Sequence, residues 1–357
     1  MASRRVTLAD VARLAGVHPA TASRALNQVD GSGLVSPATV ARVTAAANRL
    51  GYRPNPVARS LRTRRSHTVG VVIPDLANPL FPPVIRGIED RLAEGGYVAL
   101  LANTDDDPAR EHQLLERMRE RHVDGLVLAT VRRGTPEPAG PGEEDLPVVL
   151  VNRVAEDRAL PAVAADDVSG IRLAVAHLVS LGHRRIGHVA GPQDLSTGAG
   201  RLRGFRLGMA EQGLEVGPAD VVVAERYQVA EGLRCARQLL AQRPRVTAIV
   251  AANDMLALGC YRALAEAGLA CPQDCSVVGF NDMPFVDQLS PPLTSVRFDH
   301  YAMGREAAQL ILERLATPGC PTKVVYLPPE LVVRASTGPA PRGGPGTEGR
   351  AGRRRAD

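Results

Sequence analysis

The chain has 357 residues, of which 45% are hydrophobic and 23% are charged, as is ordinary for a globular protein of two or three compact units. No apolar run reaches the length of a signal peptide or a membrane span, so we expect a cytoplasmic protein without membrane contact. The five cysteines are odd in number and scattered, which argues against a disulfide framework. We expect neither a bound metal nor a cofactor.

Positive charge is concentrated at the two ends of the chain. Residues 1–65 hold eleven arginines against two acidic residues, whereas residues 66–338 hold 27 basic and 34 acidic residues. The last nineteen residues hold five arginines against two acidic residues. A merely soluble surface would mix the two signs throughout. A basic head on an acidic body is instead typical of a modular nucleic-acid binder.

Three short helices are predicted within residues 1–54. Thr7 caps the first helix and Gly16 ends it, the second runs from Pro19 to about Leu26, and Ser36 caps the third. The second helix presents small, polar and basic side chains opposite its apolar face: Ala20, Ser23, Arg24 and Asn27. Two helices around a tight turn predict a helix-turn-helix able to enter a major groove. A small bundle with an ordinary solvated face is the alternative.

Residues 55–66 form a basic segment with a short helical pattern. Asn55 is a cap residue, and Val57, Ala58 and Leu61 fall on one side of about two turns. A helix of this length is marginal in water by itself. Composition alone therefore allows either a hinge helix that folds against a partner or a plain interdomain linker.

From residue 67 to 338, apolar strand-like runs alternate with helical segments predicted near 83–94, 110–121, 170–181, 201–212 and 254–267. This alternation predicts two doubly wound parallel sheets, which bind ligands beyond the carboxyl ends of their strands. The polar residues that follow predicted strands are Asp75, Asn78, Asn103, Asn152, Asp166, Asn253–Asp254 and Asn281–Asp282. We expect Asp75, Asn78, Asp166 and Asp254 to serve loops or helix caps. We expect His183 and His188 on the surface or in a loop.

The segments TLADVARLAGVHPATASRALNQ, VSPATVARV and LGYRPNPVARSL resemble the DNA-binding head of the LacI/GalR family of bacterial transcriptional regulators. The order of elements after residue 67 resembles the sensor of the same family, which is similar to periplasmic sugar-binding proteins. The resemblance implies an α + α/β protein with a three-helix head, a hinge helix and a two-lobed sensor. It also implies a repressor of carbohydrate-related genes, controlled by a small molecule between the lobes, that binds a pseudo-palindromic operator as a homodimer.

The resemblance also implies roles for individual residues of the head. Pro19, Ala20 and Arg24 would read base edges, and Leu61 would wedge into the minor groove. The remaining expected DNA-binding residues, which are phosphate contacts or helix caps, are Thr7, Thr21, Ser23, Asn27, Ser36, Thr39 and Asn55. His18 replaces the usual serine cap, and the loop NQVDGSGLVS is about three residues longer than in well-known members, so contacts made by that loop are not carried over.

In the sensor, Arg201 matches the family arginine that grips ligand hydroxyls or carboxylates. The expected ligand-binding residues are Phe81, Asn152, Arg201, Tyr227, Asn253 and Asn281, and Phe280 is a further candidate for an aromatic wall. Asn152 and Asn281 replace aspartates found in many relatives, so ligand preference cannot be borrowed directly. By family habit we expect a sugar or sugar phosphate, with purines open.

The expected boundaries are a head at 1–54, a hinge at 55–66, a sensor at 67–338 and a disordered basic tail at 339–357. Lobe one should comprise about 67–165 plus 295–328, and lobe two about 166–290 plus 330–338. The tail lacks the apolar heptads of a tetramerisation helix. A solute-binding transport protein would need a signal peptide and no DNA-binding head. An enzyme would need a motif such as a P-loop or GxSxG, which the sequence lacks, so we expect no catalytic residue.

Overall fold

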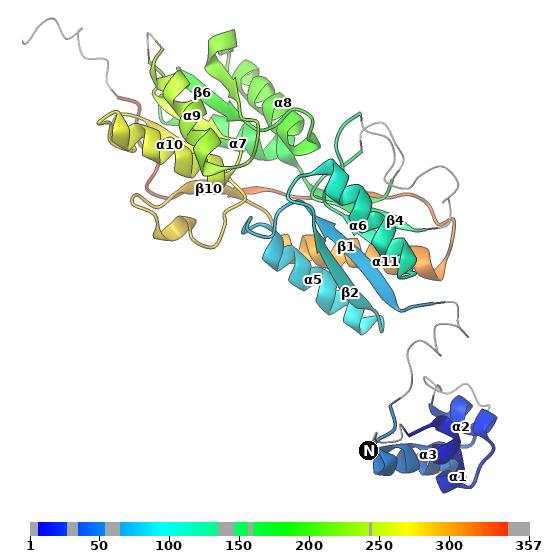
Figure 1. Cartoon of the computed structure of the whole chain (residues 1–357). Helices are drawn as coiled ribbons and strands as arrows, with labels where there is room; N and C mark the ends of the chain where they lie inside the picture. Colours follow the sequence, from blue (N-terminus) through cyan, green and yellow to red (C-terminus); the bar gives the residue numbers. More distant parts are fainter. Residues whose placement is uncertain are drawn as a thin grey trace, which may run out of the picture. The chain divides into compact units, whose positions relative to one another are not determined.

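The computed structural model describes residues 6–26, 35–53, 65–134, 146–155, 160–242 and 245–341. It divides into two compact units, Met1–His67 and Thr68–Asp357, which we call the head and the sensor (Figure 1). Three predictions concern segments that lie mostly outside the described ranges: the hinge helix at 55–66, the longer loop that follows the second helix, and the basic tail at 339–357, of which 339–341 are described. Asn27, Asn55 and Leu61 belong to this group. Among the described residues, no helix is both long and apolar enough to cross a membrane.

The head contains the three predicted helices: α1 (Leu8–Ala15), α2 (Pro19–Leu26) and α3 (Pro37–Leu50). Thr7 and Asp10 form a capping box at α1, and Gly16 ends the helix in the left-handed conformation. The Nδ1 atom of His18 accepts the Ala20 N–H at 3.2 Å, so this histidine takes over the role of the usual serine. The small core of the head is made of alanines and valines: Val11, Ala12, Ala15, Ala22, Ala25, Val35, Val43, Ala46 and Ala47.

Lobe one of the sensor contains a fully parallel six-stranded sheet in the order β11-β5-β4-β3-β1-β2. Its strands are β1 (Thr68–Ile73), β2 (Val98–Asn103), β3 (Gly125–Leu128), β4 (Val148–Val151), β5 (Ala162–Ala165) and β11 (Val324–Leu327). Its helices are α5 (Phe81–Glu94), α6 (Pro108–Glu120) and α11 (His300–Ala316). Alternate strand residues point to α6 or to the α5–α11 pair, so both faces of the sheet are covered.

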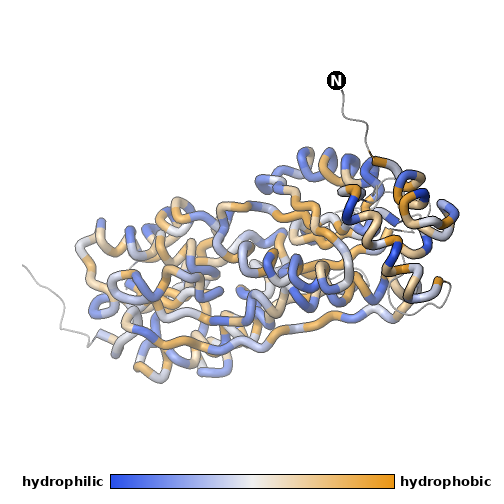
Figure 2. The backbone as a smooth tube through the Cα atoms, turned by 90° about the horizontal axis from the view of Figure 1, so that it is seen from below, coloured by the Kyte–Doolittle hydropathy of each residue, from blue (hydrophilic) through white to orange (hydrophobic). Residues whose placement is uncertain are grey.

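Lobe two contains a second six-stranded sheet in the order β12-β10-β9-β8-β6-β7. Its strands are β6 (Ile186–Ala190), β7 (Val221–Val223), β8 (Ala248–Ala251), β9 (Ser276–Phe280), β10 (Thr294–Arg297) and β12 (Glu330–Val332). Its helices are α7 (Asp167–Ser180), α8 (Ser196–Glu211), α9 (Val229–Leu240) and α10 (Asp254–Glu266), with single turns η1 (Pro218–Asp220) and η2 (Val286–Gln288). In Figure 2, hydrophobic and hydrophilic stretches alternate along the chain, as expected for buried strands between amphipathic helices.

The structure corrects three predictions for the sensor. β10 pairs with β9, so the return to lobe one at residue 295 is wrong: the chain leaves lobe two only after Arg297. The second sheet is not wholly parallel, because the short edge strand β12 runs antiparallel to β10. Helix α8 begins at Ser196, one turn earlier than predicted, which places Arg201 in its second turn.

Two buried histidines contradict the expected surface positions. His183 lies between Thr247 Oγ1 (3.0 Å), Ser276 Oγ (3.1 Å) and the carbonyl oxygen of Gly338 (3.0 Å). His188 points inward from β6, stacks on Phe205 with ring centroids 4.8 Å apart, and its Nδ1 lies 2.8 Å from the Val250 carbonyl oxygen. Polar partners from other segments satisfy His183, whereas His188 has one such partner and its Nε2 has none among the described residues. A sequence pattern does not reveal such partners.

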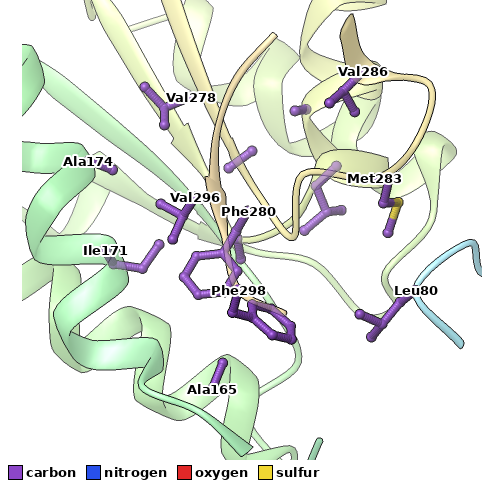
Figure 3. Packing of buried hydrophobic residues seen from close by; sticks show 14 of the residues in the cluster. Leu80, Ala165, Ile171, Ala174, Val278, Phe280, Met283, Val286, Val296 and Phe298 are labelled. Carbon is purple, nitrogen blue, oxygen red and sulfur yellow. The ribbon is translucent and has the colours of Figure 1, made fainter. Parts of the chain in front are cut away.

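Aromatic packing in lobe two supports the site described below. Figure 3 shows Phe280, at the end of β9, beside Phe298, with Ile171 of helix α7 close to the pair. The two phenyl centroids are 6.2 Å apart and tilted by 49°. Gly170 of α7 allows the helix backbone to lie close to Phe280, because a Cβ atom at this position would lie 2.6 Å from the Phe280 ring.

Candidate functional site

The outer face of α2 carries the predicted base-reading residues. Pro19, Ala20 and Arg24 are exposed, Thr21 and Ser23 are half-buried, and the alanines of the opposite face are buried. The short side chains leave the surface of this helix open to a close approach, with Arg24 as its long hydrogen-bond donor. The arrangement has the form of a helix that enters a major groove.

Three predicted phosphate-contacting or capping hydroxyls also have local structural roles. Thr7 caps α1, and its Oγ1 donates to Asp10 Oδ2 at 2.7 Å. Ser36 caps α3, and its Oγ lies 3.0 Å from Thr39 Oγ1. These hydrogen bonds fix the first turns of α1 and α3.

A pocket lies between the two lobes at the carboxyl ends of their strands. It is lined by Pro74, Asp75, Asn78, Leu80, Phe81, Asp106, Asn152, Arg153, Arg201, Arg226, Tyr227, Gln228, Asn253 and Asn281. The space between these side chains, including its opening to solvent, is about 540 Å³. All six residues expected to bind a ligand therefore lie at one place, although they come from segments that are far apart in the sequence.

Arg201 is held rigidly at the base of the pocket and is only 2% exposed. Its Nε donates to Asp167 Oδ1 at 2.7 Å and its Nη1 donates to the Ala252 carbonyl oxygen at 2.7 Å. The guanidinium carbon lies 3.9 Å from the centroid of the Phe280 ring, a cation–π contact. Burial raises the pKa of Asp167, and the charge of Arg201 opposes that shift. Phe280 therefore packs against the Arg201 guanidinium and does not itself line the pocket, although it was a candidate for the pocket wall.

Two aromatic side chains form apolar parts of the pocket wall. Phe81, the first residue of α5, is buried, and Tyr227, after β7, lies with its ring centroid 5.9 Å from the Arg201 guanidinium carbon. The Tyr227 hydroxyl donates to Thr197 Oγ1 at 3.2 Å, and burial raises its pKa, so it remains protonated. Each ring can pack against an apolar face of a ligand.

The three predicted asparagines differ in what they offer a ligand. The Oδ1 atom of Asn253 accepts the Leu256 N–H at 2.9 Å and caps α10, which leaves its amide nitrogen as the group for a ligand. Asn152 (φ 65°) and Asn281 (φ 108°) adopt left-handed backbone conformations, which asparagine tolerates better than most residues. Asn281 Oδ1 is buried without a hydrogen-bond partner among the described residues. A hydrogen-bond donor on a ligand would satisfy this oxygen.

Sequence reasoning missed Asp106, Arg153, Arg226 and Gln228. Arg153 is 4% exposed; its Nη1 donates to the Thr130 carbonyl oxygen at 3.1 Å and its Nη2 lies 3.6 Å from Asp106 Oδ1. Its Nε has no partner among the described residues, and burial lowers its pKa. The only signal in the sequence is that Arg153 directly follows Asn152, which was predicted to face the ligand.

The residues expected in loops or caps behave mostly as expected. Asp75 Oδ1 accepts the Ala77 N–H, Asn78 Oδ1 accepts the Leu80 N–H, and Asp166 caps α7. Asp75 and Asn78 also line the pocket, whereas the sequence predicted only loop or cap roles for them. Asn103 accepts a hydrogen bond from the Leu76 N–H and is not part of the lining.

Asp254 lies behind the pocket rather than in it and is fully buried. Its Oδ2 accepts the Met283 N–H at 2.8 Å and its Oδ1 accepts the Ser295 hydroxyl at 2.6 Å. Burial raises the pKa of Asp254 to about 7. Asp282 is likewise paired away from the ligand, with Arg334 Nη1 2.6 Å from its Oδ1. These two carboxylates tie the residues after Asn253 and Asn281 to β10 and to the C-terminal segment.

Comparison with known proteins gives matches over nearly the whole chain. Residues 7–55 match the model of the bacterial regulatory proteins of the lacI family, and residues 175–337 match a periplasmic binding protein-like domain. The ribose operon repressor of Halalkalibacterium halodurans is 34% identical over 331 residues, which are 93% of this chain and 97% of that protein. The HTH-type transcriptional regulator MalR of Streptomyces coelicolor is 37% identical over 346 residues, which are 94% and 97% of the two chains.

Two solved structures extend the similarity to the fold. A complex of the transcriptional regulator CelR with cellobiose is 34% identical, with a TM-score of 0.72 over 93% of this chain and 100% of that chain. The lac repressor dimer bound to operator and the anti-inducer ONPF is 28% identical, with a TM-score of 0.81 over 94% and 100% of the two chains.

Proposed function

Because this chain belongs to the LacI family of bacterial regulatory proteins, it is a sequence-specific DNA-binding regulator of transcription, and we propose that a sugar in the pocket between its lobes sets its operator affinity. The chain acts as a homodimer on operator DNA. A two-fold symmetric dimer requires two half-sites related by the same symmetry, so its operator is pseudo-palindromic.

The convergence of the polar pocket residues is the observation that carries the choice of a sugar. Sugars present many hydroxyl groups that donate and accept, and amide side chains do both. The pocket offers five amides: Asn78, Asn152, Gln228, Asn253 and Asn281. The buried, unpaired Oδ1 of Asn281 fits a hydroxyl donor, and the ring faces of Phe81 and Tyr227 fit the C–H face of a pyranose or furanose. The sugar-regulated relatives named above favour the same class.

The site residues have distinct roles in this proposal. Arg201 donates to a ligand oxygen while Asp167 and Phe280 fix its orientation, and Asn253 and Asn281 define the side of the pocket formed by lobe two. Asn152, with Phe81, provides the side formed by lobe one. A ligand that touches both lobes has a different affinity for each lobe angle, which is the condition for shifting a two-state equilibrium.

In the head, we propose that Arg24 reads a guanine and that Pro19 and Ala20 make close apolar contacts with base edges. Thr7, Thr21, Ser23, Ser36 and Thr39 would hold the register by phosphate contacts or by fixing helix ends. The proposed contacts of Asn27, Asn55 and Leu61 lie outside the described residues.

The test of the effector class is calorimetric titration of the full-length protein with ribose, cellobiose, maltose, their phosphates, and purines. We expect one sugar to bind and Asn281→Gly, which removes the amide and accepts the positive φ of residue 281, to weaken its binding at least tenfold. Glu266→Gln, which alters an exposed pair in lobe two, serves as the control and should bind normally. Binding of a purine instead would refute the sugar proposal. Unchanged sugar affinity in Asn281→Gly would refute the assigned site.

A further inference from the structure

Two loops of opposite lobes are hydrogen-bonded to one another beside the pocket. The Arg133 main-chain N–H, after β3, donates to the Asp194 carbonyl oxygen at 2.8 Å, and Arg133 Nη1 donates to the Gln193 carbonyl oxygen at 3.0 Å. The Arg132 guanidinium forms an ion pair with the Asp194 carboxylate. We call residues 132–133 and 193–194 the interlobe clasp.

A further bond joins the lobes next to the clasp. The Val154 N–H, after β4, donates to Ser196 Oγ, at the start of α8, at 3.0 Å. This bond shares no residue with the clasp, although Ser196 lies only two residues beyond Asp194. It exists only while the two lobes are close together, and it therefore reports closure independently of the clasp.

The clasp is continuous with the wall of the pocket through Asp106. Arg132 Nη2 donates to the Asp106 carbonyl oxygen at 3.2 Å and lies 3.6 Å from Asp106 Oδ1. Arg153 Nη2 lies 3.6 Å from the same carboxylate oxygen. Asp106 and Arg153 line the pocket, so one carboxylate is shared between a clasp cation and a pocket cation.

We propose that the interlobe clasp is a latch that favours the closed arrangement of the lobes before any effector binds, and that Asp106 connects its strength to the contents of the pocket. The two lobes are joined covalently by three chain crossings, and the clasp bonds add to this connection when the two loops meet. The latch is weak because its ion pair is partly exposed to solvent. The side chains of Arg132 and Asp194 are 24% and 50% exposed, and an ion pair so exposed changes an equilibrium by about two- to fivefold.

A weak latch suits a regulated protein, because a ligand can shift the equilibrium between two lobe arrangements only by the difference in its affinity for them. A latch stronger than that difference could not be opened by the ligand. A ligand that binds Asp106 or Arg153 changes how the Asp106 carboxylate is shared between Arg132 and Arg153. It thereby changes how the Arg132 guanidinium is held toward Asp194, the partner across the lobes.

The test is hydrogen–deuterium exchange on the ligand-free, full-length protein, so its result does not depend on the sugar proposal. Asp194→Asn removes the charge of the clasp and retains the shape of the side chain. Glu266→Gln is the matched control, because the pair it forms with Arg237 at 2.6 Å is similarly exposed but lies within lobe two. The reporter is the Val154 amide, and the reference is the Leu126 amide, which donates to the Pro147 carbonyl oxygen at 2.8 Å inside lobe one.

We expect the Val154 amide to exchange about two- to fivefold faster in Asp194→Asn than in the wild type, with the Leu126 amide unchanged and Glu266→Gln indistinguishable from the wild type. Arg132→Gln should reproduce the effect, and the double variant should add little to it. High salt should accelerate exchange in the wild type but hardly in Asp194→Asn. Unchanged exchange at Val154, or equal acceleration at Leu126, would overturn the proposal.

Discussion

Replacement of Arg201 by alanine should destabilise the sensor far more than loss of one ligand contact would suggest. The Arg201–Asp167 pair is buried, with side-chain exposures of 3% and 12%. Removal of the cation leaves Asp167 as a buried carboxylate without its counter-charge, a change that typically costs about 3–5 kcal/mol. The Ala252 carbonyl oxygen also loses its buried donor, which adds about 1 kcal/mol or more. The sum is a large part of the stability of a typical domain.

The pH dependence of this variant distinguishes an unpaired charge from a simple cavity. In Arg201→Ala the folded-state pKa of Asp167 is raised above its unfolded value, because burial acts without the opposing guanidinium. The variant's stability must therefore fall as pH rises above about 4, and its deficit must shrink on acidification. Urea unfolding of the wild type and variant at pH 5 and pH 7.5 measures this difference.

The double variant Arg201→Ala/Asp167→Asn provides the control, since it removes the unpaired charge and leaves the cavity. We expect it to recover at least 2 kcal/mol relative to Arg201→Ala. If Arg201→Ala costs less than about 1 kcal/mol at pH 7.5, or shows no pH dependence, the buried-pair argument fails. Because Arg201 supports the fold as well as the pocket, loss of effector binding in Arg201→Ala alone would not locate the ligand. Asn281→Gly is the better probe, because glycine accepts the positive φ of residue 281.

Three further predictions concern other parts of the chain. Gly170→Ala places a Cβ atom 2.6 Å from the Phe280 ring and should lower stability by about 1–3 kcal/mol in urea unfolding. Asp254 has a pKa raised to about 7, so its contribution to stability is present near pH 4 and is lost as pH rises through 7. Asp254→Asn should flatten the dependence of the unfolding free energy on pH between about 4 and 7, and an unchanged slope would exclude Asp254 as its source. Arg24→Ala should reduce discrimination by about 1–3 kcal/mol at one base pair of each half-site in a competition assay, and a uniform loss across all sequences would mean a phosphate contact instead.

The position of the pocket could be predicted because parallel strands end at one edge of their sheet. Each of Asn152, Asn253 and Asn281 follows a run of buried apolar residues, and the alternation of strands and helices brings those ends together. The head could be predicted for a similar reason, since Thr7, Gly16 and Ser36 are strong local signals for helix ends.

The missed features depend on partners that are distant in the sequence. The β10 residues Thr294 and Ser295 are fully buried, but a sequence with two polar residues does not have the apolar pattern of a buried strand. Their hydroxyls donate to the Arg334 carbonyl oxygen and to the Asp254 carboxylate, which are distant in the sequence. Arg153 can lie buried in the pocket wall because it pairs with the Asp106 carboxylate and donates to the Thr130 carbonyl oxygen. Local pattern carries no information on such pairings.

The most direct test of regulation by a sugar measures operator affinity with and without the sugar identified by calorimetry. Fluorescence anisotropy would follow the binding of the full-length protein to an operator duplex selected from random sequences, at fixed salt. We predict that the sugar shifts the operator dissociation constant at least tenfold in the wild type. Asn281→Gly should need a correspondingly higher sugar concentration while retaining wild-type operator affinity without sugar. An operator affinity that does not change when the pocket is saturated would contradict the account.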